Sequence, residues 1–220
     1  GKQRSRPQNI EYFFRPSISW SFISSSSFGV RVYPQGFLFD VGGSSLFPKD
    51  EHNINAAMFL CSHIAPFLMK MMNPTLNFQV GNVEQLPYIE IKDNNIGNEC
   101  IRLAKTDWDS YETSWDFTQN PIIRTGQLNL EQAFNTWQQQ NADAVAEMKR
   151  LEEENNKLFI DAYGLQDELT PDVPDAQITL TRADREKDSQ RLVSYALGCM
   201  MGRYSLDEPG LIYAHAGNQD

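Results

Sequence analysis

The sequence has few of the features that mark secreted, disulfide-stabilised or membrane proteins. Its three cysteines, Cys61, Cys100 and Cys199, are far apart and form no C-x-x-C pair, which argues against a disulfide framework or a zinc site. The most apolar run, residues 64–72, is far shorter than the roughly 20 residues that a membrane-spanning helix needs. No basic segment followed by an apolar core opens the chain, as a signal peptide would. We therefore expect a reduced, soluble, cytoplasmic protein that has no membrane partner.

Basic charge is also scarce, and it is unevenly distributed. The net charge of −10 disfavours nucleic acid when taken alone, because phosphate contacts need Lys and Arg. Residues 1–50, however, hold six basic and three acidic side chains, whereas residues 93–220 hold 11 basic and 23 acidic ones. Any DNA-binding surface should therefore lie in the first third, with the remainder acting as an acidic scaffold.

The sequence has enough apolar side chains for a folded core. Hydrophobic residues make up 40% of its 220 residues and aromatic residues 11%, and the aromatic side chains are spread over most of the length. The chain opens on Gly1 instead of Met. We interpret it as a piece of a longer protein, although removal of a tag would leave the same start.

Residues 17–47 have the composition of a small antiparallel sheet. They are rich in β-branched, aromatic and serine residues and are interrupted by glycine and proline. The pattern predicts strands near residues 18–24, 28–33 and 37–41, joined by short turns.

A helix and a second extended segment should follow this sheet. Apolar residues recur at helical spacing between residues 53 and 72, which predicts an amphipathic helix bent at Pro66. Residues 75–91 then have the character of extended structure. The order of strands, helix and strands predicts an α+β fold whose small mixed α/β domain covers residues 1–95.

The remainder is predicted to be mainly helical. Residues 96–168 should form a helical spacer, with a first helix around 98–106 and a long one over 130–159. Residues 169–220 should form a linker and a C-terminal helix.

The long helix carries a seam of side chains at alternating steps of four and three, and Asn141 and Asn155 lie on it. Asparagine on such a seam lowers stability but can fix the register against a partner helix. The pattern leaves two readings open: packing on neighbouring parts of this chain, or pairing with another part of a larger protein.

Two segments imitate methyltransferase motifs. Residues 39–44 resemble an Asp and Gly loop that holds S-adenosylmethionine, but they lack its separated glycines and are interpreted as a turn. Residues 73–76 resemble an Asn-Pro-Pro-aromatic motif, but they lack the second proline and the aromatic residue that stacks on a flipped adenine. We therefore expect no catalytic residue and no bound cofactor in this chain.

Metal binding is also not expected. The densest group of carboxylates, which could hold Mg²⁺ but could equally cap helices, consists of Asp107, Asp109, Glu112 and Asp116. The three histidines, His52, His63 and His215, have no ligand spacing.

The candidate DNA-binding residues lie in the predicted hairpin. They are Arg15, Ser24, Ser25, Ser26, Ser27 and Arg31. Hydroxyl groups suit contacts to phosphate and base edges, and arginine can read guanine with two hydrogen bonds. A serine-rich loop that is merely solvated would have the same composition, so the residues alone leave both readings open.

Several segments, in the same order along the chain, resemble one known family. They are residues 19–25 with 28–31, residues 36–47, residues 68–81, Leu86-Pro87, residues 107–117, residues 163–169 and residues 195–207. This pattern is similar to the target-recognition region of the PglX family, the adenine-specific DNA methyltransferases of BREX phage-defence systems.

The resemblance implies a target-recognition domain followed by a helical spacer. It implies that the parent enzyme transfers a methyl group from S-adenosylmethionine to adenine, while this region chooses the DNA sequence. The implied partners are double-stranded DNA, the methyltransferase domain of the parent protein and other BREX proteins. The alternatives are the specificity region of a type I or fused type II restriction-modification enzyme, and a structural docking module of a defence complex that does not bind DNA.

Overall fold

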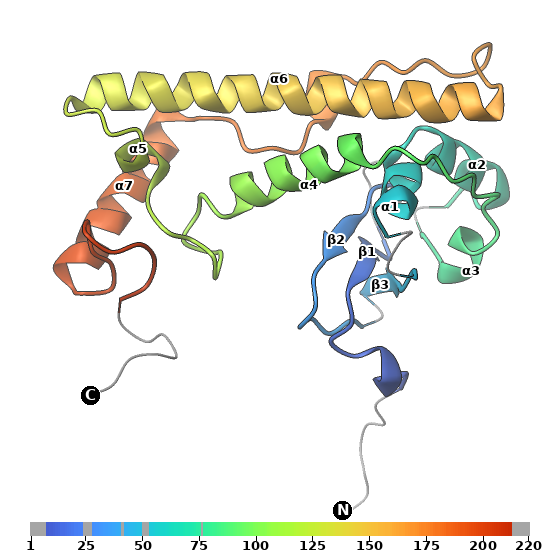
Figure 1. The fold of residues 1–220 in the computed structure, drawn as a ribbon, viewed down its shortest axis with the longest axis horizontal. Helices are drawn as coiled ribbons and strands as arrows, with labels where there is room; N and C mark the ends of the chain where they lie inside the picture. Colours follow the sequence, from blue (N-terminus) through green and yellow to red (C-terminus); the bar gives the residue numbers. More distant parts are fainter. Residues whose placement is uncertain (1–7, 24–27, 41, 50–52, 76, 213–220) are drawn as a thin grey trace, which may run out of the picture. The chain divides into compact units, whose positions relative to one another are not determined.

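The chain folds into two compact units, and each is described separately. The computed structural model describes residues 8–23, 28–40, 42–49, 53–75 and 77–212 (Figure 1). The first unit comprises residues 1–99 and 151–172, and the second comprises residues 100–150 and 173–220. The long helix α6 (Leu130–Tyr163) contributes to both units, with the change at residue 151. The predicted division of the chain at residues 95 and 168, into a target-recognition domain, a helical spacer and a C-terminal part, stays a prediction.

The first unit contains a three-stranded antiparallel sheet in the order β2-β1-β3. The strands are β1 (Ser17–Ser21), β2 (Arg31–Tyr33) and β3 (Gly43–Leu46), and the short 3-10 helix η1 (Ile10–Tyr12) precedes them. Together with the helices, this sheet confirms the α+β class. The strand predicted at residues 37–41 is wrong, since β3 begins at Gly43. The carbonyl of Phe37 instead accepts a hydrogen bond from the Phe14 N–H, at 3.0 Å.

Two helices follow the sheet in place of the single one predicted. They are α1 (Asn53–Cys61) and α2 (Ile64–Met72), which are bent by 66° at Ser62 and His63. The predicted bend at Pro66 is wrong, because Pro66 lies in the first turn of α2, where no intrahelical bond needs its missing N–H. Among the described residues no single helix has the length and apolar composition to cross a membrane, whereas α1 and α2 meet both criteria when taken as a bent pair.

Residues 75–91 do not form the predicted strands. Their described residues contain one isolated bridge, from Asn77 to Ile23, and the short helix α3 (Val80–Val83). The following segment is held by Asn55, a buried residue of α1. The Oδ1 atom of Asn55 accepts from the Tyr88 hydroxyl at 2.8 Å and from the Ile91 N–H at 3.0 Å. The side chain of Asn55 thus accepts the hydrogen bond from a backbone N–H that a neighbouring strand would accept in a sheet.

The core of the first unit forms where α1 packs on β1 and β2 (Figure 1). Ile18 and Trp20 of β1 are buried, and the indole N–H of Trp20 donates to the Phe78 carbonyl at 2.9 Å. The part of α6 that belongs to this unit adds Phe159, whose ring lies 5.7 Å from that of Phe59 in α1. Two asparagines of α6 bind α1 and the bend that follows it: Asn155 donates to the Met58 carbonyl at 2.9 Å, and Asn156 accepts from the His63 N–H at 2.9 Å.

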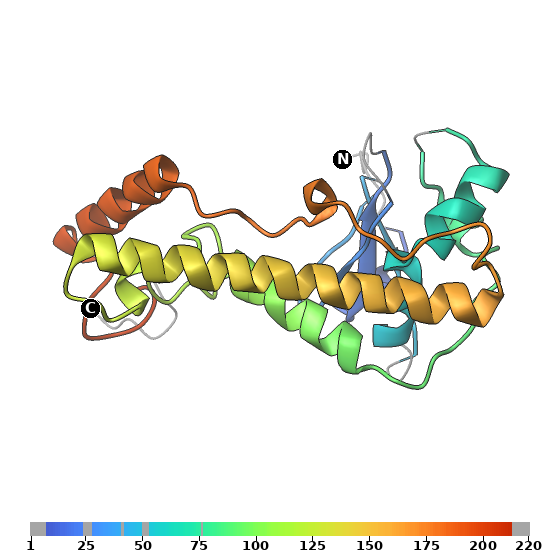
Figure 2. The same ribbon diagram turned by 90° about the horizontal axis from the view of Figure 1, so that it is seen from above.

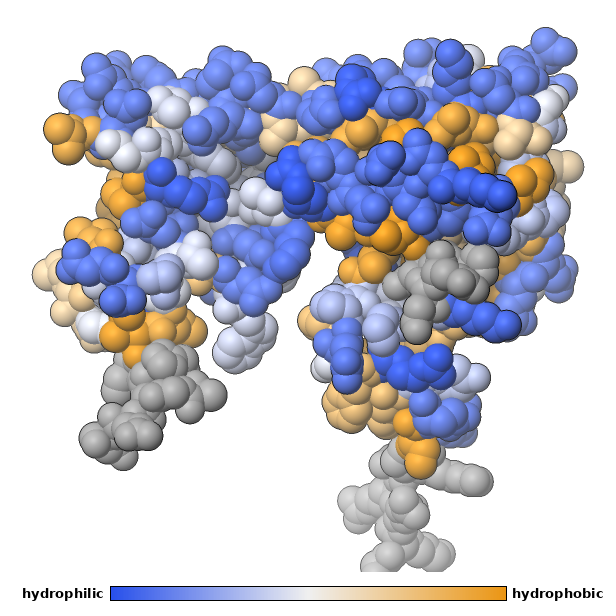
Figure 3. Space-filling model, viewed as in Figure 1, coloured by the Kyte–Doolittle hydropathy of each residue, from blue (hydrophilic) through white to orange (hydrophobic). Residues whose placement is uncertain are grey.

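The second unit is built from helices and one long irregular segment. Its helices are most of α4 (Asn95–Trp108), α5 (Pro121–Arg124), the first part of α6, the 3-10 helix η3 (Asp175–Gln177) and α7 (Arg185–Met200). In Figures 1 and 2 the segment that leads from α6 to α7 returns along α6. Hydrophilic side chains dominate the surface of α6 in the view of Figure 3. A solvated face opposite a buried seam is typical of an amphipathic helix.

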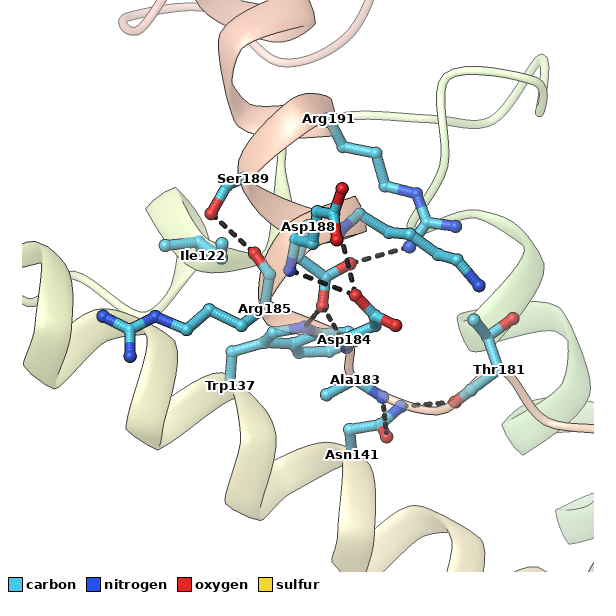
Figure 4. A network of polar contacts seen from close by, with 12 residues as sticks. Ile122, Trp137, Asn141, Thr181, Ala183, Asp184, Arg185, Asp188, Ser189 and Arg191 are labelled. Atoms are coloured by element: carbon cyan, nitrogen blue, oxygen red, sulfur yellow. Dashed lines mark hydrogen bonds and ion pairs between the residues drawn. The ribbon is translucent and has the colours of Figure 1, made fainter.

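Asn141 fixes the returning segment to α6 in the second unit. Its Nδ2 donates to the Thr181 carbonyl and its Oδ1 accepts from the Ala183 N–H, both at 2.8 Å (Figure 4). Asn141 and Asn155 therefore bind backbone of this same chain. This confirms, for these two residues, the reading in which the long helix packs on its own neighbours.

The start of α7 is organised around the buried carboxylate of Asp188. It accepts hydrogen bonds from the Trp137 indole and from the Asp184 N–H, and it forms an ion pair with Arg191 at 2.7 Å (Figure 4). The side chain of Asp184 caps the helix by accepting from two backbone N–H groups of its first turn. At the other end of α7, Tyr195 packs with Phe117 and Tyr204 in a small aromatic core.

Candidate nucleic-acid interface

The sheet of the first unit has one apolar and one polar face. Successive residues of a strand point to opposite faces, and directly paired residues share a face. Ile18 and Trp20 point to the buried side. The opposite face, which we call the hydroxyl face, follows from the register and consists of Ser17, Ser19, Ser21, Arg31, Tyr33 and Ser45.

The hydroxyl face is only partly used by the sheet itself. The Ser19 hydroxyl donates to the Ser44 carbonyl at 2.9 Å, and Ser17 is buried. Ser21 and Arg31 are exposed, and Ser45 is half-buried. Hydroxyl groups and a guanidinium on one open face are the groups that bind phosphate and base edges.

Arg31 is the first residue of β2, directly across from Ser19. Its Nη1 donates to the carbonyl of Val30 at 3.1 Å. Glu152 of α6, within the same unit, lies close enough for the two charges to interact. Burial raises the pKa of the Glu152 carboxyl to about 7, and the positive charge of Arg31 opposes this rise. The charge of the guanidinium therefore acts on a carboxyl that is partly protonated near neutral pH.

Arg15 lies before the start of strand β1, and Arg31 lies opposite its middle residue. Arg15 precedes Ser17, which pairs with Tyr33, whereas Arg31 pairs with Ser19. Two residues further along, Ser21 ends the strand on the side that leads to residues 24–27. Arg31 is thus nearer than Arg15 to that connection. Ser24, Ser25, Ser26 and Ser27 lie outside the described residues.

Both methyltransferase-like segments have local structural roles. The Asp40 carboxylate accepts from the Gly43 N–H at 3.0 Å and closes the turn before β3. Asn73 follows α2, and its Oδ1 accepts from the Thr75 N–H and hydroxyl, while its Nδ2 donates to the Asn77 carbonyl. Each of these side chains therefore organises its own loop.

The four clustered carboxylates in the second unit bind different partners. Asp107 accepts from the N–H and hydroxyl of Thr181, and Lys105 bridges Asp109 and Asp116. Glu112 accepts from the Tyr204 hydroxyl. Within the described ranges, no three His, Cys, Asp or Glu side chains converge as a metal site requires.

The site residues predicted from the sequence did not include several members of the hydroxyl face, namely Ser19, Ser21, Tyr33 and Ser45. The alternation Ser17-Ile18-Ser19-Trp20-Ser21 was a usable signal, because period-two polarity marks one face of a strand. Ser45 carried no such signal, since its strand has a short sequence of glycine, serine and leucine.

Comparison with known proteins relates this small α+β region and its helices to part of much larger methyltransferases. No family model matches the chain. It is 38% identical over 223 residues to the adenine-specific methyltransferase PglX of Lacticaseibacillus casei (strain Zhang), a match that covers 97% of this chain and 19% of that protein. It is 28% identical to the adenine-specific methyltransferase BrxX of Escherichia coli (strain HS), covering 99% of this chain and 20% of that protein. The chain is similar to a region of these two methyltransferases and spans about a fifth of their length.

Proposed function

We propose that this region selects the DNA sequence that a PglX-like adenine-specific methyltransferase modifies, within a BREX phage-defence system. The observation that carries the proposal is the match, over almost the whole chain, to proteins named as adenine-specific methyltransferases. The rest of the parent protein would bind S-adenosylmethionine and hold the adenine. Double-stranded DNA, the methyltransferase domain and other BREX proteins are the partners that this proposal implies.

The chemistry of the first unit supports a role in reading DNA. The hydroxyl face combines exposed Ser21 and Arg31 in the third of the chain that has a positive net charge. The acidic residues are concentrated after residue 93, and those of residues 151–172 belong to the same unit, so DNA would have to approach the sheet away from them because they repel phosphate. We infer that DNA approaches the hydroxyl face, that residues 24–27 take part in the contact, and that Arg31 supplies a base contact.

Replacing Arg31 with alanine in the full-length methyltransferase tests this assignment. A guanidinium that reads a guanine with two hydrogen bonds contributes about 1–3 kcal/mol of discrimination, so the variant should methylate a motif relaxed at one position. A guanidinium that binds only phosphate predicts weaker binding to every sequence, with a shallower dependence on salt and an unchanged motif. Sequencing of methylated adenines, together with DNA titrations at several salt concentrations, distinguishes the two roles.

Arg185 provides the matched control, because it is an exposed arginine at the start of α7 in the second unit. Arg185→Ala should leave both the motif and the DNA affinity unchanged. A third result would remove Arg31 from the interface: a lower melting temperature of Arg31→Ala with an intact motif and intact affinity. Arg31 would then serve the fold through its interaction with Glu152.

A further inference from the structure

The end of the sheet at which β1 begins carries an exposed cluster of aromatic residues that are not part of the buried core. We call it the aromatic tip, and it is formed by residues 10–15 and 33–39. Its base is a half-buried group of rings that also includes Phe47. The ring centre of Phe47 lies 4.9 Å from that of Tyr12 and 5.1 Å from that of Phe39, and the ring centres of Phe39 and Phe13 are 5.7 Å apart. These rings support the outer residues of the tip.

The outer part of the tip contains a backbone conformation that is rare for a bulky residue. Phe14 has a φ of 63°, in the left-handed region, which costs on the order of 1 kcal/mol or more for a residue with a Cβ atom. The Phe14 N–H donates to the Phe37 carbonyl, and the Phe14 carbonyl accepts from the Gly36 N–H, both at 3.0 Å. Gly36 has a φ of 113°, which glycine adopts readily. The two segments are therefore locked together in a strained arrangement.

This arrangement leaves large apolar side chains facing solvent. The exposed fractions are 52% for Phe14, 49% for Phe37, 61% for Leu38 and 63% for Ile10. A strained residue that contributes little to the core is not explained by the stability of the first unit. Strain of this kind is concentrated at binding sites, where the surrounding structure fixes it in advance.

The charge beside these apolar side chains indicates the kind of partner. Arg15 follows Phe14, is exposed, and has its guanidinium carbon 5.2 Å from the centre of the Tyr12 ring. The first fifteen residues contain four basic side chains and one acidic one. Apolar side chains next to positive charge suit a polyanion with stacked aromatic bases, because proteins that bend DNA insert such side chains between base steps while arginine binds phosphate.

We propose that the aromatic tip is a second DNA contact, in which Phe14 and Phe37 press between base pairs and Arg15 binds the adjacent phosphate. It lies at the start of β1, whereas exposed Ser21 of the hydroxyl face ends that strand, so the tip would touch the duplex beside the bases that the hydroxyl face reads. This inference rests on the proposed function, but it concerns how the duplex is deformed and not which sequence is chosen.

The test uses the full-length methyltransferase and duplexes that carry 2-aminopurine at single positions within and beside the methylated site. The fluorescence of 2-aminopurine rises when the base loses its stacking partners. We expect a position beside the site to brighten with the unaltered protein. Phe14→Asn keeps a residue that tolerates the left-handed region, and with Phe37→Ser it should abolish most of this rise while duplex affinity falls by less than about tenfold. Phe14→Trp keeps an aromatic side chain at this position and should retain the fluorescence rise.

Two further variants distinguish phosphate binding by Arg15 from insertion of apolar side chains between base pairs. Arg15→Gln should weaken binding to all duplexes and reduce the salt slope by about one phosphate contact, with the fluorescence rise retained at saturation. Val193→Ser removes a comparably exposed apolar side chain from α7 and should change neither quantity.

The inference fails, and the proposed function stands, if the Phe14 and Phe37 variants brighten the probe fully and retain the methylated motif. It also fails if hydroxyl-radical labelling shows the Phe14 and Phe37 side chains covered in the full-length protein without DNA, because the tip would then be a contact to another part of the protein. The proposed function itself fails only if the motif does not depend on this region, which the fluorescence experiment does not measure.

Discussion

Replacing Asn141 with leucine should change the stability of the protein, and the sign of that change distinguishes two roles for an asparagine in a long helix. In a coiled coil, a seam asparagine fixes register at a cost in stability, so replacing it with leucine stabilises the protein. Here Asn141 instead holds the backbone of Thr181 and Ala183 through two hydrogen bonds of 2.8 Å. Asn141→Leu should therefore destabilise the second unit.

The magnitude follows from the groups that lose their partners. The Ala183 N–H and the Thr181 carbonyl belong to half-buried residues, and each should cost about 1–1.5 kcal/mol when unpaired. Burial of the leucine side chain should offset about 1 kcal/mol of this loss. We expect a net loss of about 1–2 kcal/mol, which for a chain of this length lowers the melting temperature by roughly 2–8 °C.

Thermal unfolding of the variant gives the sign, and hydrogen exchange gives the location. The Ala183 amide should lose protection in Asn141→Leu, because its acceptor is gone. Gln140→Leu, one residue earlier on the exposed side of α6, is the matched control and should change stability by less than about 0.5 kcal/mol. A higher melting temperature for Asn141→Leu, or a protected Ala183 amide, would refute the reasoning.

Two further predictions concern Glu152 and Gly198. The pKa of Glu152 is raised from its usual 4.5 to about 7, so its neutral form stabilises the fold below about pH 4.5 and this contribution is lost as pH rises through 7. Glu152→Gln should thus raise the free energy of unfolding by about 2–3 kcal/mol above pH 7 and by nothing below pH 4.5, and urea titrations showing the same difference at both pH values would contradict this. In Gly198→Ala the new Cβ would lie 2.6 Å from the Tyr204 ring, so urea unfolding should show a loss of about 1–3 kcal/mol, whereas Gly81→Ala, with open space around it, should be close to neutral.

The helices that depend on local periodicity could be predicted from the sequence, and those set by distant partners could not. The apolar repeat that begins at Leu130 predicted α6 because it is regular over many turns. The break between α1 and α2 was misplaced because Pro66 was the visible signal. Its true position involves the His63 N–H, which donates to Asn156, 93 residues away.

The strands were harder to predict for a similar reason. The residues of β3, Gly43 to Leu46, have low intrinsic strand propensity, and they pair because β1 offers a free edge. The segment Phe78-Gln79-Val80 looked like a strand, but the Phe78 N–H donates to the Phe22 carbonyl and a helix begins at Val80. For the candidate site, Arg31 was identifiable as a basic residue in a hairpin, whereas its neighbour Glu152 is 121 positions away in the sequence and was not.

The central claim is that this region chooses the methylated DNA sequence, and an exchange of regions tests it most directly. Residues 8–212 would replace the matching portion of a PglX-like methyltransferase that modifies a different motif, and methylated adenines would be mapped across the genome of cells that express the chimera. We expect the motif of the chimera to change to that of the protein from which this region came. A chimera that is active but keeps the motif of the recipient would contradict it.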